Sequence, residues 1–219
     1  MPPREPSGRP RVLGARSLAR GVERLARLDP DLARVTRALG LPPLWARAQG
    51  FPTLVHIILE QQVSLASARA AFDRLTAHAA PLTPHNFLTL DDATLRRIGF
   101  SRQKTAYCRL LAQALAAGEL DLAALARLGD EAARAALLRL KGVGPWTAEI
   151  YLLMALRRPD AWPAGDLALA VALARLKGWP ARPTTAELLA YGARWRPLRA
   201  VAARLLWHYY LSGMPALPG

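Results

Sequence analysis

The stretch 140–166 reads LKGVGPWTAEIYLLMALRRPDAWPAGD. It begins with the turn Gly142–Gly144, and glycine tolerates left-handed backbone angles and lets another group approach the main chain closely. Pro145 follows, where a helix can begin without losing a hydrogen bond. Apolar residues recur at spacings of three and four after this proline, and at a spacing of four in the preceding run 131–139. The stretch therefore predicts a helix, a hairpin and a second helix.

The predicted hairpin has the chemistry of an anion site. N–H groups at a turn and at a helix N-terminus point outward with partial positive charge, which suits a phosphate. Lys141 adds a full positive charge beside Gly142 and Gly144. A glycine that merely caps one of two packed helices is the alternative, and it is common.

Asp166 is the second notable feature of the stretch. Residues 162–165 have the sequence Trp-Pro-Ala-Gly, which cannot continue a helix, and Asp166 stands at the start of the apolar run 167–176. A carboxylate exposed at such a helix start is one candidate for a catalytic group. Its alternative role is a helix N-cap, which aspartate commonly fills.

The hairpin and the aspartate, about twenty residues apart, resemble the helix-hairpin-helix DNA glycosylase superfamily. The closest resemblance is to its 3-methyladenine DNA glycosylase II branch, the alkylbase DNA glycosylases. That branch has a hairpin G-[IV]-G-x-W-T-A, matched at 142–148, and a loop P-x-[DG]-D, matched at 163–166. Its segments Q-[QL]-[VI]-S and G-[FL]-S-x-x-K are matched at 61–64 and 99–104. The resemblance covers about residues 20–212.

Composition limits the class of protein. The chain has 219 residues, 52% of them hydrophobic, and a formal net charge of +14. This positive excess favours a nucleic-acid partner, although an arginine-rich composition throughout the chain is the alternative cause. No apolar run reaches the roughly 18 residues that a membrane span needs, and residues 1–16 lack the apolar centre of a signal peptide. We expect a cytoplasmic, nucleoid-associated protein.

The chain offers few metal-binding side chains. Cys108 is its single cysteine, which excludes a disulfide framework, a thiolate zinc site and a four-cysteine iron–sulfur cluster. Cys108 lies on the apolar side of a predicted helix, as a small core residue would. The four histidines do not have the spacing of a metal site. We therefore expect no cofactor for catalysis.

Helical periodicity runs through the chain and no strand pattern interrupts it, so we predict an all-α fold. The predicted helices are 17–28, 30–39, 51–62, 64–79, 91–97, 101–117, 130–140, 145–157, 166–177, 184–194 and 196–211. Residues 1–16, with four prolines and four arginines, are predicted to be a disordered basic arm.

The resemblance implies how these helices are organised. It implies two helical subdomains flanking a DNA-binding cleft within 17–219, one formed by 50–140 and the other by 17–49 plus 141–219. Larger bacterial relatives carry an N-terminal α/β domain. Only about fifty residues precede the helix at Phe51 and their pattern is helical, so we expect that domain to be absent and the site to be more open.

By the same resemblance, main-chain groups would hold the DNA backbone without reading its sequence. The implied DNA contacts are Gly99, Ser101, Lys104, Lys141, Gly142, Val143 and Gly144. The carbonyls of Leu138, Leu140 and Val143 would ligate a monovalent cation, Na⁺ or K⁺, that bridges to phosphate. Gln62 would be the wedge that fills the space left by an extruded base; capping its own helix is the alternative.

The remaining implied roles concern the reaction. Asp166 would be the catalytic carboxylate. Relatives that also cut the DNA strand have a lysine at the position of Trp146, so we expect hydrolysis without lyase activity. Trp146 and Trp207 would stack on a cationic base, with core packing as their alternative. Ile150 and Leu167 replace aromatic residues of relatives, so the pocket should be less aromatic.

The leading hypothesis is a monomeric, monofunctional enzyme that flips 3-methyladenine-type bases out of damaged DNA and hydrolyses the N-glycosidic bond. It would leave an abasic site. A glycosylase for another damaged base is one alternative. A helix-hairpin-helix protein that binds DNA without catalysis is the other.

Overall fold

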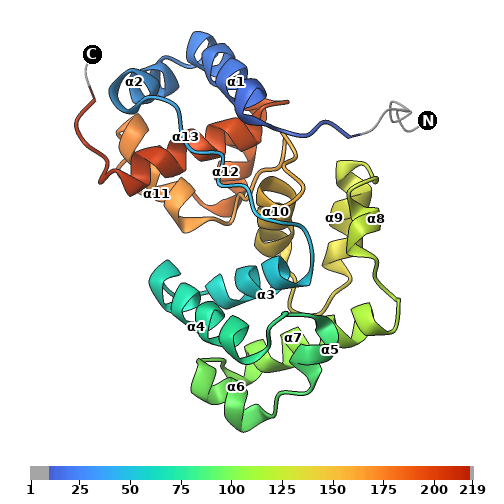
Figure 1. Cartoon of the computed structure of the whole chain (residues 1–219). Helices are drawn as coiled ribbons and strands as arrows, with labels where there is room; N and C mark the ends of the chain where they lie inside the picture. The colour runs from blue at the N-terminus through green and yellow to red at the C-terminus, as the bar shows by residue number, and fades with distance from the viewer. Residues whose placement is uncertain (1–9, 218–219) are drawn as a thin grey trace. The chain divides into compact units, whose positions relative to one another are not determined.

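The computed structural model describes residues 10–217, and within them all regular secondary structure is helical (Figure 1). This confirms the all-α prediction for the part of the chain described. Most of the predicted basic arm, residues 1–9, lies outside it. The elements are α1 (Ala15–Leu28), α2 (Pro30–Leu39), α3 (Phe51–Glu60), α4 (Leu65–His78), α5 (Pro84–Leu88), α6 (Asp92–Ile98), α7 (Arg102–Ala116), α8 (Leu122–Leu125), α9 (Asp130–Leu138), α10 (Pro145–Met154), α11 (Leu167–Lys177), α12 (Thr185–Gly192), the 3₁₀-helix η1 (Ala193–Trp195) and α13 (Arg199–Leu211).

Several predicted helix ends were wrong. Helix α3 ends at Glu60 rather than at residue 62, because Gln61 is extended and Gln62 has a left-handed φ of 56°. Helix α10 ends at Met154 rather than at 157. Helix α13 begins at Arg199 rather than at 196, beyond a proline that lacks a backbone N–H. The short helices α5 and α8 were not predicted, because a single turn has little periodicity to detect.

The chain forms two compact units, and among the described residues the first comprises Pro10 and Arg47–Tyr151. Helix α3 is its core: eight of its ten residues are buried, and it packs against α4 and α7. A helix that is apolar on all sides is stable only when it is enclosed in this way. The C-terminal end of α3 carries Gln61 and Gln62, so a rigid core element positions both side chains.

The second unit comprises Arg11–Ala46 and Leu152–Gly219, of which residues up to 217 are described. Helix α13 is its centre and packs against α11, α2 and α1. The fully buried Arg204 of α13 donates hydrogen bonds to the carbonyls of Leu44, Leu153 and Ala200, at 2.8–2.9 Å. Burial lowers the pKa of Arg204 to about 10. These bonds tie segments distant in sequence to one helix.

Asp29 anchors α11 to the N-terminal helices in the second unit. Its side chain caps α2 and accepts hydrogen bonds from the Lys177 ammonium at 3.1 Å and the Trp195 indole at 3.0 Å. Lys177 also donates to Asp31 at 2.6 Å. Burial opposes the charge on Lys177, but the two carboxylates outweigh it and raise its pKa. The C-terminal end of α11 is therefore fixed, and Asp166 lies at its other end.

The predicted subdomains divided the chain at residue 140, whereas the compact units divide it at Tyr151. The hairpin and most of α10 thus belong to the first unit and Asp166 to the second.

Across residues 10–217, no helix combines the length and the apolarity that crossing a membrane requires.

Candidate DNA interface and active-site aspartate

The predicted helix-hairpin-helix is present as α9, a tight turn at 139–144, and α10. Arg134 of α9 and Glu149 of α10 form a hydrogen-bonded ion pair between the two helices. Glu149 is buried, and Arg134 also pairs with Glu131 at 2.8 Å. A buried carboxylate is stable only when it is paired, so this contact fixes the angle at which the hairpin leaves α9.

Gly142 occupies a position that no other residue fits. Its φ is 92°, in the left-handed region. A Cβ added there would lie 2.2 Å from Cγ of Tyr107. Gly144 differs, because nothing lies within 4 Å of the Cβ it would carry. The first glycine lets the hairpin pack on α7, and the second leaves its outer side open.

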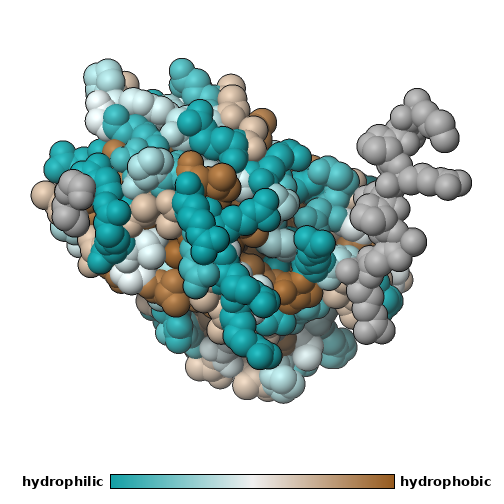
Figure 2. All heavy atoms as spheres, turned by 90° about the horizontal axis from the view of Figure 1, so that it is seen from above, coloured by the Kyte–Doolittle hydropathy of each residue, from teal (hydrophilic) through white to brown (hydrophobic). Residues whose placement is uncertain are grey.

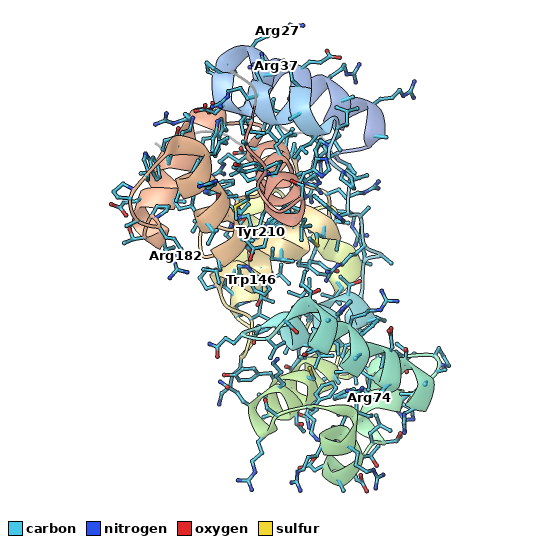
Figure 3. All side chains as sticks on the ribbon, turned by 90° about the vertical axis from the view of Figure 1, so that its left-hand side faces the viewer. Arg27, Arg37, Arg74, Trp146, Arg182 and Tyr210 are labelled. Atoms are coloured by element: carbon cyan, nitrogen blue, oxygen red, sulfur yellow. The ribbon has the colours of Figure 1, made fainter. Side chains whose placement is uncertain are left out.

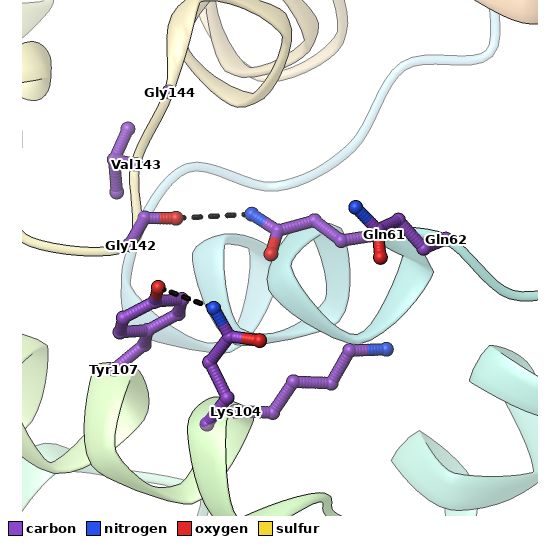
Figure 4. A pocket seen from close by; sticks show the side chains of 8 residues that line it. Gln61, Gln62, Lys104, Tyr107, Gly142, Val143 and Gly144 are labelled. Carbon is purple, nitrogen blue, oxygen red and sulfur yellow. Dashed lines mark hydrogen bonds between the residues drawn. The ribbon is translucent and has the colours of Figure 1, made fainter.

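Gln61 holds the hairpin from the other side. Its Nε2 donates to the Gly142 carbonyl at 3.0 Å (Figure 4), and it also donates to Oγ1 of Thr147 on α10 at 2.9 Å. Because Gln61 directly follows α3, the hairpin is tied to the core helix of its unit. This rigidity suits a group that must present N–H donors in one geometry.

A hollow of about 390 Å³ opens beside the hairpin within the first unit. None of its lining residues is acidic: they are Gln61, Gln62, Gln103, Lys104, Tyr107, Gly142, Val143 and Gly144. In the part of the chain described, the N–H groups of Gly142 and Gly144 donate to no protein acceptor, whereas that of Val143 donates to Leu140 at 3.0 Å. With the exposed Lys141 alongside, these two donors are suited to bind an anion.

The second predicted backbone contact is the turn between α6 and α7. Gly99 ends α6 with a left-handed φ of 113°, and Ser101 caps α7 by accepting the N–H of Lys104 at 3.2 Å. The Lys104 ammonium donates to the Leu59 carbonyl at 2.6 Å, and burial lowers its pKa. Lys104 therefore caps the end of α3 as well as lining the hollow.

Gln62 follows Gln61 in the short segment between α3 and α4. It is exposed and holds a left-handed φ of 56°, which is uncommon outside glycine. Gln61 before it is anchored, and Ser64 after it caps α4 by accepting the Ser67 N–H. The two anchors hold the strained residue between them, and such strain is often found at functional positions.

Asp166 is held from two directions within the second unit. Its Oδ1 accepts the backbone N–H of Leu169 at 3.0 Å, which makes it the N-cap of α11. The same oxygen accepts the indole N–H of Trp207 at 3.1 Å. Trp207 is itself buried against Trp45, with ring centroids 6.3 Å apart. The carboxylate thus has a fixed orientation and lies at a helix N-terminus, where negative charge is favoured.

The other predicted site residues differ in accessibility. Trp146, labelled in Figure 3, is half-buried on α10, and Leu167 is 59% exposed. Ile150 is buried in the core, where it has no surface to offer a substrate. The burial of Trp207 agrees with core packing, and its indole orients Asp166 rather than facing solvent. Stacking of either tryptophan on a base stays a prediction.

Sequence reasoning missed the residues that hold the site together. Gln61 was recognised in a motif, but its contact with Gly142 joins positions 81 residues apart. Tyr107 lies three residues beyond the matched segment 99–104, and it forms the surface on which Gly142 packs. Nothing in the types of these residues indicates that Gln61 and Tyr107 would contact Gly142.

The cation predicted at the hairpin would use main-chain oxygens. Leu138 and Lys141 are exposed, and the Leu140 carbonyl accepts one hydrogen bond, from Val143, which leaves a lone pair available. Carbonyl oxygens are the donors that hard cations prefer, so the chemistry fits. Among residues 10–217 there is no cluster of three or more His, Cys, Asp or Glu that could hold a metal ion.

The single cysteine, Cys108, is fully buried, as predicted, and burial raises the pKa of its thiol.

A family model described as "HhH-GPD superfamily base excision DNA repair protein" matches residues 55–197, which include the hairpin and Asp166. The chain belongs to this family. Its membership in the HhH-GPD superfamily accounts for the order of the motifs and for the helix-hairpin-helix between α9 and α10.

One solved structure is similar to this protein over most of the length of both chains. It is the 3-methyladenine DNA glycosylase of Schizosaccharomyces pombe in complex with abasic DNA, with a TM-score of 0.83 and 26% identity over 90% of this chain and 99% of that one. A DNA-3-methyladenine glycosidase from Bacillus halodurans has a TM-score of 0.74 and 28% identity, covering 87% of this chain and 88% of that one.

The chain is also similar to a Mycobacterium tuberculosis protein described as a "probable bifunctional transcriptional activator/DNA repair enzyme". The two are 34% identical over 84% of this chain. The chain spans 41% of that relative and 56% of a Bacillus subtilis relative, to which it is 29% identical over 70% of its own length.

Proposed function

We propose that this protein excises alkylated bases of the 3-methyladenine type from DNA, hydrolysing the N-glycosidic bond and leaving an abasic site. The observation that carries the proposal is the Asp166 carboxylate, held by the Leu169 and Trp207 N–H groups in a chain of the base excision repair family. The similar proteins named above support the alkylated-base class.

In this proposal the hairpin grips the DNA backbone. The N–H groups of Gly142 and Gly144 hold a phosphate, and Lys141 adds attraction. A Na⁺ or K⁺ ion on the carbonyls of Leu138, Leu140 and Val143 would add positive charge at the same phosphate. These contacts are independent of base sequence, as a search for rare lesions requires.

Asp166 supports the chemical step. The C1′–N bond breaks and its electron pair leaves with the alkylated base, which thereby loses its positive charge. The sugar acquires oxocarbenium character, which a nearby carboxylate stabilises. Water adds to C1′, and Asp166 aligns it or accepts its proton. The N–H groups of Leu169 and Trp207 hold the carboxylate in the one orientation that this role needs.

Trp146 supports simple hydrolysis. By the family resemblance it occupies the position where strand-cleaving relatives carry a lysine, and an indole cannot form a Schiff base with the sugar. We expect no covalent adduct when the protein and damaged DNA are treated with borohydride and resolved by denaturing electrophoresis. A trapped adduct would contradict hydrolysis without lyase activity, whereas base release without an adduct would support it.

Gln62 is the proposed wedge, because it is exposed and lies next to the anchored Gln61. We expect Gln62→Ala to slow base release from duplex DNA by roughly 10- to 100-fold, since extruding a base costs a few kcal/mol that a wedge offsets. Release from single-stranded DNA should change much less. Gln113→Ala, at an exposed position of α7, is the matched control. Equal activity of Gln62→Ala and the control on duplex DNA would remove Gln62 from this role.

The function itself is tested with a panel of oligonucleotides that each carry one modified base. Alkali cleaves the strand wherever a base has been released. Cleavage at 3-methyladenine-type bases supports the proposal, and cleavage only at oxidised or deaminated bases would replace it with another glycosylase. Tight binding without cleavage of any member would indicate a DNA-binding protein without catalysis.

A further inference from the structure

The positive charge is distributed unequally between the two units. Arg11–Ala46 and residues 152–217 contain sixteen Arg and Lys against six Asp and Glu, whereas Arg47–Tyr151 contains twelve against nine. The unit that holds the hairpin therefore carries little of the net charge of +14. Most of the excess positive charge lies in the other unit, so DNA binding by the hairpin does not explain it.

A stripe of arginines lies on α1. Its members recur at spacings of four, four and three, which places them within one side of a helix. All are exposed: they are Arg16, Arg20, Arg24 and Arg27, and we call them the α1 stripe. The opposite side of α1 buries Leu18, Val22 and Leu25 against the unit. Figure 2 looks down on this part of the molecule and shows hydrophilic side chains covering much of it, and Figure 3 labels Arg27 at the end of the helix.

The α1 stripe is not neutralised by the protein. In the part of the chain described, none of its four guanidinium groups makes a hydrogen bond or an ion pair. Three carboxylates of the same unit bind other cations: Asp29 and Asp31 pair with Lys177, and Asp160 pairs with Arg199. The one acidic residue of α1 is the exposed Glu23.

Helix stability explains only one member of the α1 stripe, Arg27, which lies in the last turn, where the helix dipole favours positive charge. Arg16 lies in the first turn of α1, where the helix dipole disfavours positive charge, and that turn has no acidic residue. The apolar side of α1 is already used, because the helix packs against α2 and α13. The apolar side of α1 therefore cannot insert into a lipid surface, which is how a basic amphipathic helix binds a membrane.

We propose that the α1 stripe is a sequence-independent contact to the phosphate backbone of duplex DNA, additional to the hairpin. The identity of the polyanion rests on the proposed function. From Arg16 to Arg27 the helix rises about 16.5 Å, which matches the axial rise of about five phosphates on one strand. Arginine binds phosphate through several N–H groups, so four of them along one helix form a continuous cationic surface.

The test measures the affinity for undamaged duplex DNA by fluorescence anisotropy over a series of salt concentrations. We expect the triple variant R16Q/R20Q/R24Q to bind more weakly and to lower the slope of log K against log salt by about 1 to 3, since each phosphate contact contributes roughly 0.9. The turnover of bound, damaged DNA should not change. Thermal melting should be unaffected, because glutamine and arginine have similar helix propensities.

Two further variants make the outcome decisive. R69Q/R109Q/R127Q removes the same charge from residues that already face Asp73, Asp92 and Asp121, and it should change the slope much less. R16K/R20K/R24K keeps the charge and should keep most of the slope. An unchanged slope in R16Q/R20Q/R24Q, or an equal fall in both glutamine triples, would overturn the proposal. Because this assay uses undamaged DNA, its result is independent of whether base release occurs.

Discussion

Asp166→Asn is expected to lower the rate of base release by about 10²- to 10⁴-fold while DNA affinity stays within a few-fold of the parent. Asparagine is as good an N-cap as aspartate, so α11 should keep its start. Its side-chain oxygen can still accept the N–H groups of Leu169 and Trp207. The substitution therefore removes the negative charge and little else. Single-turnover assays on an oligonucleotide with one alkylated base measure the rate directly.

Asp91→Asn is the matched control for this change. Asp91 caps α6 by accepting the Thr94 N–H at 2.7 Å, so the two substitutions alter the same kind of local contact. We expect base release by this control to equal that of the parent. Parent-like release by Asp166→Asn would reject the catalytic role of the carboxylate. Binding without release would support it.

Gly142→Ala is expected to lose most affinity for DNA and to destabilise the protein by roughly 2–5 kcal/mol. The added methyl group would collide with the ring of Tyr107, and alanine is strained at a φ of 92°. Overpacking and left-handed backbone strain each cost about 1–3 kcal/mol. Because both glycine N–H groups depend on this turn, damaged and undamaged DNA should be affected alike. Thermal melting and anisotropy measure the two effects.

Gly118→Ala and Gly144→Ala separate three effects of Gly142→Ala: backbone strain, the collision with Tyr107 and the loss of DNA binding. Gly118 has a φ of 73° with no atom within 4 Å of an added Cβ, so its alanine variant reports backbone strain without a collision. Gly144→Ala should fold normally, since its surroundings are open, yet weaken binding because the methyl group lies beside the proposed phosphate. Unchanged DNA affinity in both hairpin variants, Gly142→Ala and Gly144→Ala, would contradict the hairpin assignment.

The local features of this protein could be predicted from sequence because their causes lie within a few residues. Ser64, Ser101 and Thr184 each cap a helix by accepting an N–H three residues later, and each was recognised as a helix start. The hairpin glycines and Asp166 were found in the same way, since turn and cap chemistry is local.

The helix ends were harder to predict, because the residue that ends a helix is chosen by what surrounds it. Gln61 and Gln62 have the composition to continue α3. The helix stops before them because the Gln61 side chain binds Gly142 and Thr147 on the hairpin side of the unit. A pattern within the helix cannot report this competition.

The sequence by itself determined an all-α chain of this superfamily, with a hairpin suited to phosphate and one aspartate at a helix start. Only the tertiary structure decided how each is held. It placed Gly142 between Gln61 and Tyr107, used the Lys104 charge to cap α3, and brought Trp207 to Asp166 across 41 residues of sequence. The physical reason is that such contacts depend on the packing of distant segments, whereas periodicity and capping depend on neighbours along the chain.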